Sequence, residues 1–135
     1  MANALYDKGR EGFLDGTIDW DTDNIKVVLV DAADYAVDLA NHNDLDDIPV
    51  ISRVATSANL GTKTVAAGVA DAADITFSAV AGDPSEALII YQDTGVSATS
   101  RLIAYIDTAT GLPVTPNGGD IQVQWDAGAN KIFKL

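Results

Sequence analysis

The sequence predicts an all-β domain, a β-sandwich of the jelly-roll or immunoglobulin type with about eight short strands and a short N-terminal helix. Short apolar runs of strand length alternate with segments rich in Gly, Asp, Asn, Pro and Thr. Of the 20 acidic residues, 18 are Asp, which favours turns, and only 2 are Glu, which favours helices. A length of 135 residues with 47% hydrophobic residues predicts a single β-sandwich domain over 1–135.

The helical pattern is confined to the N-terminal segment 1–16. Apolar or small residues recur at four-residue intervals from Leu5 to Phe13, which places them on one stripe of a helix. Asn3 stands where an N-cap would accept the first free N–H groups, and Gly16 stands just past the expected end. We therefore predict a short helix over residues 3–15.

Three of the expected strands are apolar on both faces, as is typical of strands that are covered on two sides. They are Ile25–Val30, 87–91 and Leu102–Ile106. Two origins of the second cover fit this pattern equally well. A symmetric partner could bury one face, since obligate interfaces resemble a core cut in half, or the strands could lie within the sandwich beneath the N-terminal helix.

The other expected strands are shorter or alternate between apolar and polar residues, which is the period of a strand with one buried face. We expect them at 50–56, 63–66, 74–80, 120–125 and 131–135. The five residues between Trp125 and Lys131 suit a hairpin, so the last two strands are expected to pair.

Two connecting segments are longer than a simple turn. Residues 41–49 are expected to form a loop or one helical turn. Residues 108–119 contain Pro113, Pro116 and a pair of glycines. Long connections of this kind often carry binding residues, so this loop is a candidate contact site.

Charge and composition exclude several classes of partner and site. With 8 Lys+Arg against 20 Asp+Glu the net charge is 8 − 20 = −12, whereas nucleic acids and anionic membranes are bound by clustered cations, so we expect neither partner. The absence of Cys excludes disulfides, thiolate metal sites and cysteine nucleophiles. The charged first residues lack the apolar centre of a secretory signal, and no window approaches the roughly 18 apolar residues of a membrane span.

The motif Asp93-Thr94-Gly95 follows an apolar strand, as the catalytic motif of aspartic proteases does. That chemistry needs two aspartates sharing one proton, which a homodimer could supply. However, Gln92 stands where these enzymes place an apolar residue, and their downstream apolar-apolar-Gly element is missing. We therefore interpret the motif as a turn in which Asp93 caps its own loop.

Acidic clusters suggest weak candidates for metal binding. Asp19, Asp21 and Asp23 alternate and offer three oxygens, but the Gly and Glu of a calcium-binding EF-hand loop are absent. A second cluster, residues 44–47, lies near His42, and one His without Cys makes a poor transition-metal site. The sequence predicts solvated loops at both places and no resident metal, and leaves calcium binding by the first cluster open.

Other catalytic arrangements are missing as well. His42 is the single imidazole, and no Ser occupies the strand-to-helix elbow of a hydrolase. The Gly118-Gly119 pair lacks the Lys of a phosphate-binding loop. We therefore expect no enzyme, no catalytic residue and no cofactor.

The two tryptophans lead to opposite expectations. Trp20 stands between Asp19 and Asp21, which favours an exposed ring and a partner contact. Trp125 shares its strand face with Ile121 and Val123, which favours burial in the core.

Three long segments carry a resemblance to a known class of proteins. They read MANALYDKGREGFLDGTIDWDTDNIKVVLVD, DDIPVISRVATS and RLIAYIDTATGLPVTPNGGDIQVQWDAGANKIFKL. Together these segments resemble small virion proteins of tailed bacteriophages, of the head decoration or capsid cement type. The likeness covers nearly the whole chain and includes no catalytic motif.

This resemblance implies a structural protein on the outer surface of the capsid, made in the host cytoplasm. Its partner would be the assembled major capsid protein, and the chain would form homo-oligomers, dimers or trimers, at local symmetry axes. An alternative is a head-fibre, tail or baseplate module that recognises a host receptor or glycan. The residues that we expect to contact partners are Leu5, Tyr6, Phe13, Leu14, Trp20, Leu112, Pro113, Val114 and Pro116.

Overall fold

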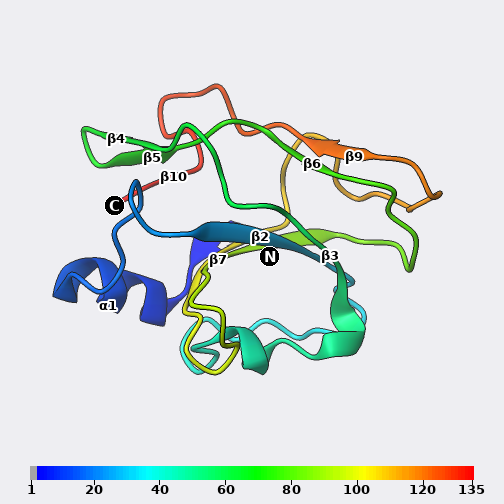
Figure 1. Ribbon diagram of the computed structural model, residues 1–135, viewed down its shortest axis with the longest axis horizontal. Helices are drawn as coiled ribbons and strands as arrows, with labels where there is room; N and C mark the ends of the chain where they lie inside the picture. Colours follow the sequence, from blue (N-terminus) through cyan, green and yellow to red (C-terminus); the bar gives the residue numbers. More distant parts are fainter. Residues whose placement is uncertain (1–2) are drawn as a thin grey trace.

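The computed structural model describes residues 3–135, and it confirms the all-β, sandwich-like fold. A five-stranded antiparallel sheet in the order β1-β8-β7-β2-β3 lies at the centre of the molecule (Figure 1). Its strands are β1 (Ala4–Leu5), β2 (Ile25–Val30), β3 (Arg53–Thr56), β7 (Ala87–Gln92) and β8 (Leu102–Ile106).

Two smaller sheets form a second layer over one face of the central sheet (Figure 1). One contains β10 (Phe133–Lys134), β5 (Val69–Asp71) and β4 (Thr64–Ala66) in that order, and the other pairs β6 (Ile75–Phe77) with β9 (Ile121–Val123). The expected hairpin between the last two strands is wrong, because β9 pairs with β6 and β10 pairs with β5.

The main hydrophobic core fills the space between these two layers. Alternate residues of β2, Ile25, Val27 and Leu29, point into it and are fully buried. Phe77 of β6 and Val123 of β9 meet them from the second layer. The alternation expected for these two short strands is confirmed, since the central residue of each is exposed and its two neighbours are buried.

A second core covers the opposite face of the central sheet. Val28 and Ile89 on that face are fully buried. The cover comes from the irregular segment 31–52, which contributes Tyr35 and Ile48 and runs beneath the sheet in Figure 1. The chain itself therefore buries the second face of these strands, and most of the cover is this loop rather than the N-terminal helix.

Two short 3-10 turns shape this covering segment. They are η1 (Leu45–Asp47) and η2 (Val50–Ser52). The first confirms the helical turn expected within 41–49. The second occupies the beginning of the strand expected at 50–56, which therefore starts only at Arg53.

Helix α1 (Asp7–Asp15) packs against β8 at one end of the molecule (Figure 1). It begins later than predicted, with Tyr6 rather than Asn3 at its N-cap, because residues 4–5 pair with β8 as strand β1. The Asn3 carboxamide instead accepts the N–H groups of Asp107 and Thr108. Gly16 ends the helix in the left-handed conformation, as its position predicts.

Among residues 3–135, no helix combines the length and the apolar character needed to cross a lipid bilayer.

Candidate partner-binding surface

Three of the nine residues predicted to contact a partner are buried in the fold. Leu5 is 9% exposed, Tyr6 is fully buried and Trp20 is 3% exposed. The expected exposure of Trp20 is wrong because its ring turns inward between exposed neighbours. Its indole N–H donates to the Asp71 carbonyl at 3.0 Å, and the ring packs edge-on against Phe133. Leu5 and Trp20 therefore belong to the main core and Tyr6 to the second core.

Phe13 and Leu14, the last apolar residues of α1, do reach the surface. Leu14 is 89% exposed, the largest exposure of any bulky apolar side chain in the described part of the chain. Phe13 is half-buried, and its ring centroid lies 5.7 Å from that of Phe133. The sequence prediction therefore holds for the exposure of the helix end, and the structure adds an aromatic neighbour from β10.

Three further apolar residues come to this helix end from the second layer. Val65 on β4 and Leu135 beyond β10 are both more than half exposed, and with Phe13 and Phe133 they line an apolar hollow of about 300 Å³. Trp20 and Ile18 also line the hollow. We call Phe13, Leu14, Val65, Phe133 and Leu135 the helix-end patch.

The loop that carries the other nominated residues lies elsewhere. Pro113 is exposed, whereas Leu112 and Val114 are half-buried and pack against the main core. Val114 also exchanges backbone hydrogen bonds with Ser85 at 2.8 and 2.9 Å. This loop, with half-buried Pro116, lies near β9 at the far end of the molecule from α1 (Figure 1). The nine residues therefore do not form one surface.

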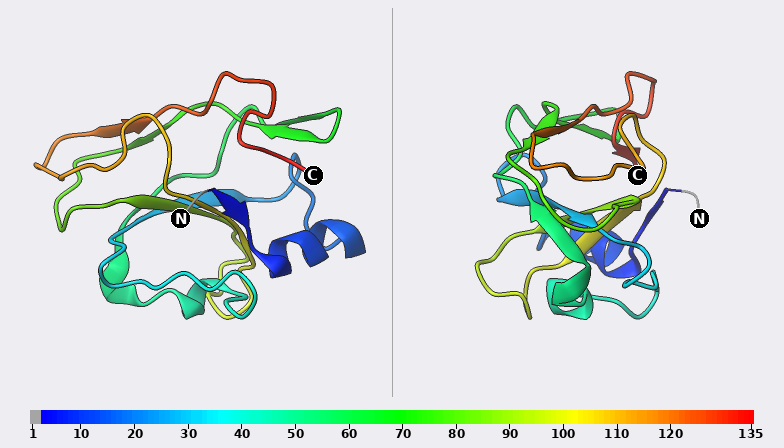
Figure 2. Two further views of the ribbon diagram at one scale, coloured as in Figure 1. Left: turned by 180° about the vertical axis from the view of Figure 1, so that it is seen from behind. Right: turned by 90° about the vertical axis from the view of Figure 1, so that its right-hand side faces the viewer.

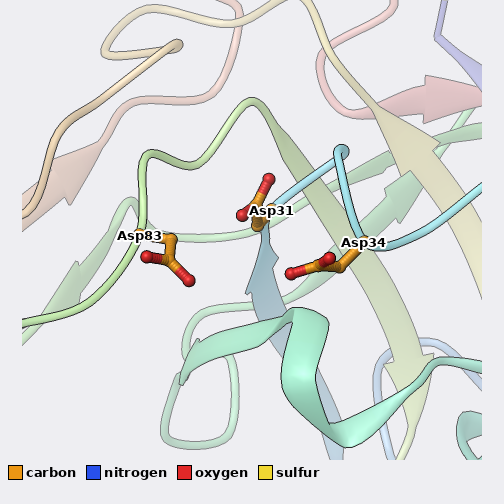
Figure 3. Close-up of side chains that lie close together, drawn as sticks. All are labelled: Asp31, Asp34 and Asp83. Carbon is orange, nitrogen blue, oxygen red and sulfur yellow. The ribbon is translucent and has the colours of Figure 1, made fainter.

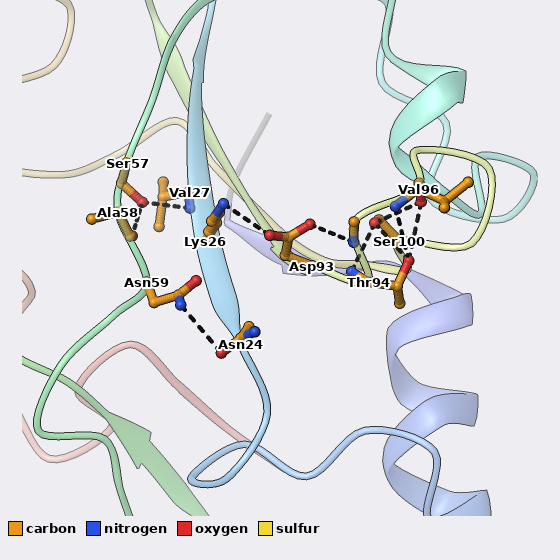
Figure 4. Close-up of polar contacts among 11 residues, drawn as sticks. Asn24, Lys26, Val27, Ser57, Ala58, Asn59, Asp93, Thr94, Val96 and Ser100 are labelled. Atoms are coloured by element: carbon orange, nitrogen blue, oxygen red, sulfur yellow. Dashed lines mark hydrogen bonds and ion pairs between the residues drawn. The ribbon is translucent and has the colours of Figure 1, made fainter.

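The Asp93-Thr94-Gly95 motif forms a closed turn at the end of β7 (Figure 4). The Asp93 carboxylate pairs with the Lys26 ammonium at 2.8 Å and accepts the Gly95 N–H at 3.0 Å. The Lys26 contact, followed by the Gly95 N–H, lowers the pKa of Asp93. Asp93 thus caps its own loop, as interpreted from the sequence, and its partner is a cation rather than a second carboxyl group.

Replacing Asp93 by Asn is expected to lower the free energy of unfolding by about 0.5–1 kcal/mol at pH 7. Because the pKa of Asp93 is lowered in the fold, its contribution is present above the unfolded pKa near 4 and is lost as the pH falls through the folded value. The free energies of unfolding of wild type and variant, measured with urea, should therefore differ at pH 7 and converge as the pH falls through the folded pKa of Asp93. Lys26→Met removes the other partner of the same ion pair and should show the same pH dependence. A difference in the free energy of unfolding between wild type and variant that stays constant across pH would contradict this role of Asp93.

The alternating acids at 19–23 do not converge on a common point. The Asp23 carboxylate accepts the Asp19 backbone N–H at 2.8 Å and the Gln92 amide at 2.7 Å, so it closes the loop internally. Asp19 and Asp21 interact directly, which raises the pKa of Asp21 and lowers that of Asp19. This arrangement fits the solvated loop predicted from the sequence.

His42 is also engaged in the fold rather than turned toward the acidic residues 44–47. Its Nδ1 lies 2.9 Å from the Tyr35 hydroxyl and accepts the Asp38 backbone N–H at 3.2 Å. The Tyr35 hydroxyl in turn lies 2.9 Å from that of Tyr6, which is fully buried beneath the sheet. The imidazole therefore helps to fasten the covering segment to the central sheet.

A different acidic group, which the sequence pattern does not reveal, is assembled by the fold. Asp31, Asp34 and Asp83 bring carboxylate oxygens within 4.8 Å of one another (Figure 3). Asp31 is buried and accepts the Ala33 N–H at 2.8 Å, whereas the other two are exposed. Among the described residues these three could share a hard cation through oxygen ligands. The three residues come from two loops that lie about fifty positions apart in the chain, so their spacing in the sequence does not predict the group.

Comparison with known protein families found no family model that matches this chain, and comparison with curated proteins found no match.

Proposed function

We propose that this chain is a capsid decoration protein of a tailed bacteriophage, which binds the assembled major capsid protein and stabilises the head. The observation that carries the proposal is the helix-end patch. Phe13, Val65, Phe133 and Leu135 line one apolar hollow, and Leu14, the residue after Phe13 on α1, is 89% exposed in an otherwise strongly acidic molecule. Exposed apolar side chains gathered in this way are typical of a protein contact. The resemblance of the chain to virion proteins includes the helix that presents it.

A second exposed apolar site supports a bridging role. Val50 and Ile51 on η2 are 76% and 72% exposed, and they belong to the covering segment below the sheet. A protein that ties neighbouring capsid subunits together needs two separate contact surfaces. The helix-end patch and this pair meet that requirement from different elements of one chain.

Charge and copy number fit the same role. A net charge of −12 keeps the protein from adhering to DNA and suits a shell surface with basic patches. The chain would act as a homo-oligomer, a dimer or trimer at a local symmetry axis. Because a capsid offers many linked sites, modest individual contacts then add up to strong retention. The chain would thus act on the outer surface of the virion head through contacts rather than chemistry.

Replacing Leu14 by Asp is expected to weaken capsid binding at least about tenfold, because a charge introduced into an apolar contact must be desolvated. Co-sedimentation with capsids that lack the protein measures the affinity and the saturating stoichiometry. Since Leu14 is 89% exposed, the variant should keep the wild-type free energy of unfolding to within about 0.5 kcal/mol.

Val96→Asp is the matched control, because Val96 is 57% exposed but belongs to the loop after β7 and not to the helix-end patch. It should bind capsids like the wild type. Equal loss of binding in both variants would contradict the assignment of the patch. Absence of saturable binding by the wild type, together with binding to host cells, would instead favour a receptor- or glycan-binding module of the fibre, tail or baseplate.

A further inference from the structure

A groove of about 840 Å³ runs along one side of the sandwich, apart from the apolar hollow. Its lower wall is β1 with β8, and its upper wall is the C-terminal segment from residue 124 to β10. Figure 2 (right) shows the blue β1 and the red C-terminal segment on the same side of the molecule. We call it the edge groove; it shares Phe133 with the helix-end patch but opens beside β1.

Each wall of the edge groove ends in the last strand of a sheet. β1 is the terminal strand of the five-stranded sheet, and β10 is the terminal strand of the three-stranded sheet. The main chain of a terminal strand has one side without a strand partner. Extended peptides bind proteins by adding to such edges through main-chain hydrogen bonds.

The charge of the edge groove is opposite to that of the molecule. Arg10, Lys131 and Lys134 line it, and Asp126 is the acidic residue of the lining, so the charge of the lining residues is 3 − 1 = +2. Arg10 also pairs at 3.5 Å with Asp7, which lies outside the lining, so the two lysines carry most of the positive charge. The whole chain carries −12. The Asp126 carboxylate already accepts the Gly128 N–H at 3.0 Å. The groove therefore attracts anionic groups that the rest of the surface repels.

Apolar side chains lie between the cations. Trp125 and Ile132 are half-buried in the upper wall, and Ile106 of β8 lies in the lower wall. An extended peptide presents alternate side chains to opposite sides. One set can therefore contact the half-buried Trp125 and Ile132, while the other set reaches the cations at the rim; Ile106, which is 5% exposed, forms the base of the groove.

We propose that the edge groove binds an extended, acidic polypeptide segment of another protein as an added strand. The acids of that segment pair with Arg10, Lys131 and Lys134, and its alternate apolar residues contact Trp125. The capsid-binding role is not needed for this inference, because different residues carry the two contacts.

The probe is an eight-residue peptide of alternating Asp and Val with blocked ends, and its matched control alternates Lys and Val. Isothermal titration calorimetry at about 0.15 M salt, where the Debye length is about 8 Å and distant charges are screened, should show one acidic peptide per chain and no binding of the basic peptide. Lys134→Glu should weaken binding of the acidic peptide about tenfold. Lys8→Glu makes the same charge change on α1 outside the groove, and it should change the affinity less than about twofold.

Two further measurements decide the mode of binding. N-methylation of alternate peptide bonds should abolish binding, because it removes the donors that an added strand needs. Undiminished affinity of the methylated peptide would overturn the added strand. Failure of the acidic peptide to bind, or equal binding of the basic one, would overturn the proposal. Binding of an acidic oligosaccharide, such as trigalacturonate, without peptide binding would do so as well. Circular dichroism confirms that each variant is folded.

Discussion

Replacing Gly9 by Ala is expected to lower the free energy of unfolding by about 2–3 kcal/mol, although the same change in an exposed helix raises it by about 1 kcal/mol. The reversal follows from the close contact between α1 and β8. A Cβ at position 9 would lie 2.8 Å from the Ile103 Cα and 2.9 Å from the carbonyl oxygens of Leu102 and Ile103. These are backbone atoms of a central strand, so α1 must move away as a whole.

Two other glycines provide graded controls for this prediction. At Gly12 the added Cβ meets side-chain atoms of the buried Ile18 rather than backbone, and a side chain can shift more readily than a paired strand, so Gly12→Ala should cost less than Gly9→Ala. At Gly61 nothing lies within 4 Å, so Gly61→Ala should change the free energy of unfolding by less than about 0.5 kcal/mol. Urea unfolding of the three variants measures the order. A stabilised Gly9→Ala protein would show that α1 does not rest directly on β8.

Replacing Arg53 by Met is expected to lower the free energy of unfolding by about 2–3 kcal/mol. From β3 its guanidinium donates to the Leu45 carbonyl at 2.7 Å and to the Ile48 carbonyl at 2.6 and 3.0 Å. These bonds hold the segment that covers the second core, in which Ile48 is fully buried. Urea unfolding gives the change in stability. In the variant, hydrogen exchange of the backbone amides of residues 45–48 should become faster than in the wild type, while the amides of β2 stay protected.

Arg53→Lys tests the geometry of this contact, because one ammonium group does not reproduce the planar fork that reaches two carbonyls. It should recover less than half of the lost stability. Arg101→Met is the control for removing an arginine elsewhere. Arg101 pairs with Asp15 at 3.8 Å and donates to the Thr17 hydroxyl at 2.5 Å, both exposed contacts, and should contribute about 1 kcal/mol or less. If Arg53→Met and Arg101→Met cost the same, Arg53 does not anchor the covering segment.

Strands β2, β7 and β8 of the central sheet could be predicted from the sequence because each is a largely apolar run between polar turns, whereas β1 lies within the segment predicted as a helix. The bounds of β2 and β8 agree with the prediction residue for residue. The short strand β5 was not predicted, since its three residues, Val-Ala-Asp, show no period. The pairing of β9 with β10 was predicted wrongly, because a suitable loop between two strands does not exclude more favourable partners elsewhere in the chain, here β6 and β5 in two separate sheets.

The candidate surface was predictable only in part. The helix pattern led to Phe13 and Leu14, which are near the C-terminal end of α1 and reach the surface. Acidic neighbours misled the prediction for Trp20, because they mark the exposure of the backbone turn and not the direction of the ring. The contribution of Val65 and Phe133 depends on the meeting of segments more than fifty residues apart, for which a single sequence carries no signal.

The most direct test of the decoration role is electron cryomicroscopy of capsids reconstructed with and without the bound chain. The proposal predicts difference density of the size of this domain at symmetric positions on the outer surface of the head. The helix-end patch around Leu14 should face the shell, and the Leu14→Asp protein should leave those positions empty. Two results would contradict the account. One is the absence of difference density on the head at a wild-type concentration that saturates binding, and the other is density in which the helix-end patch faces solvent.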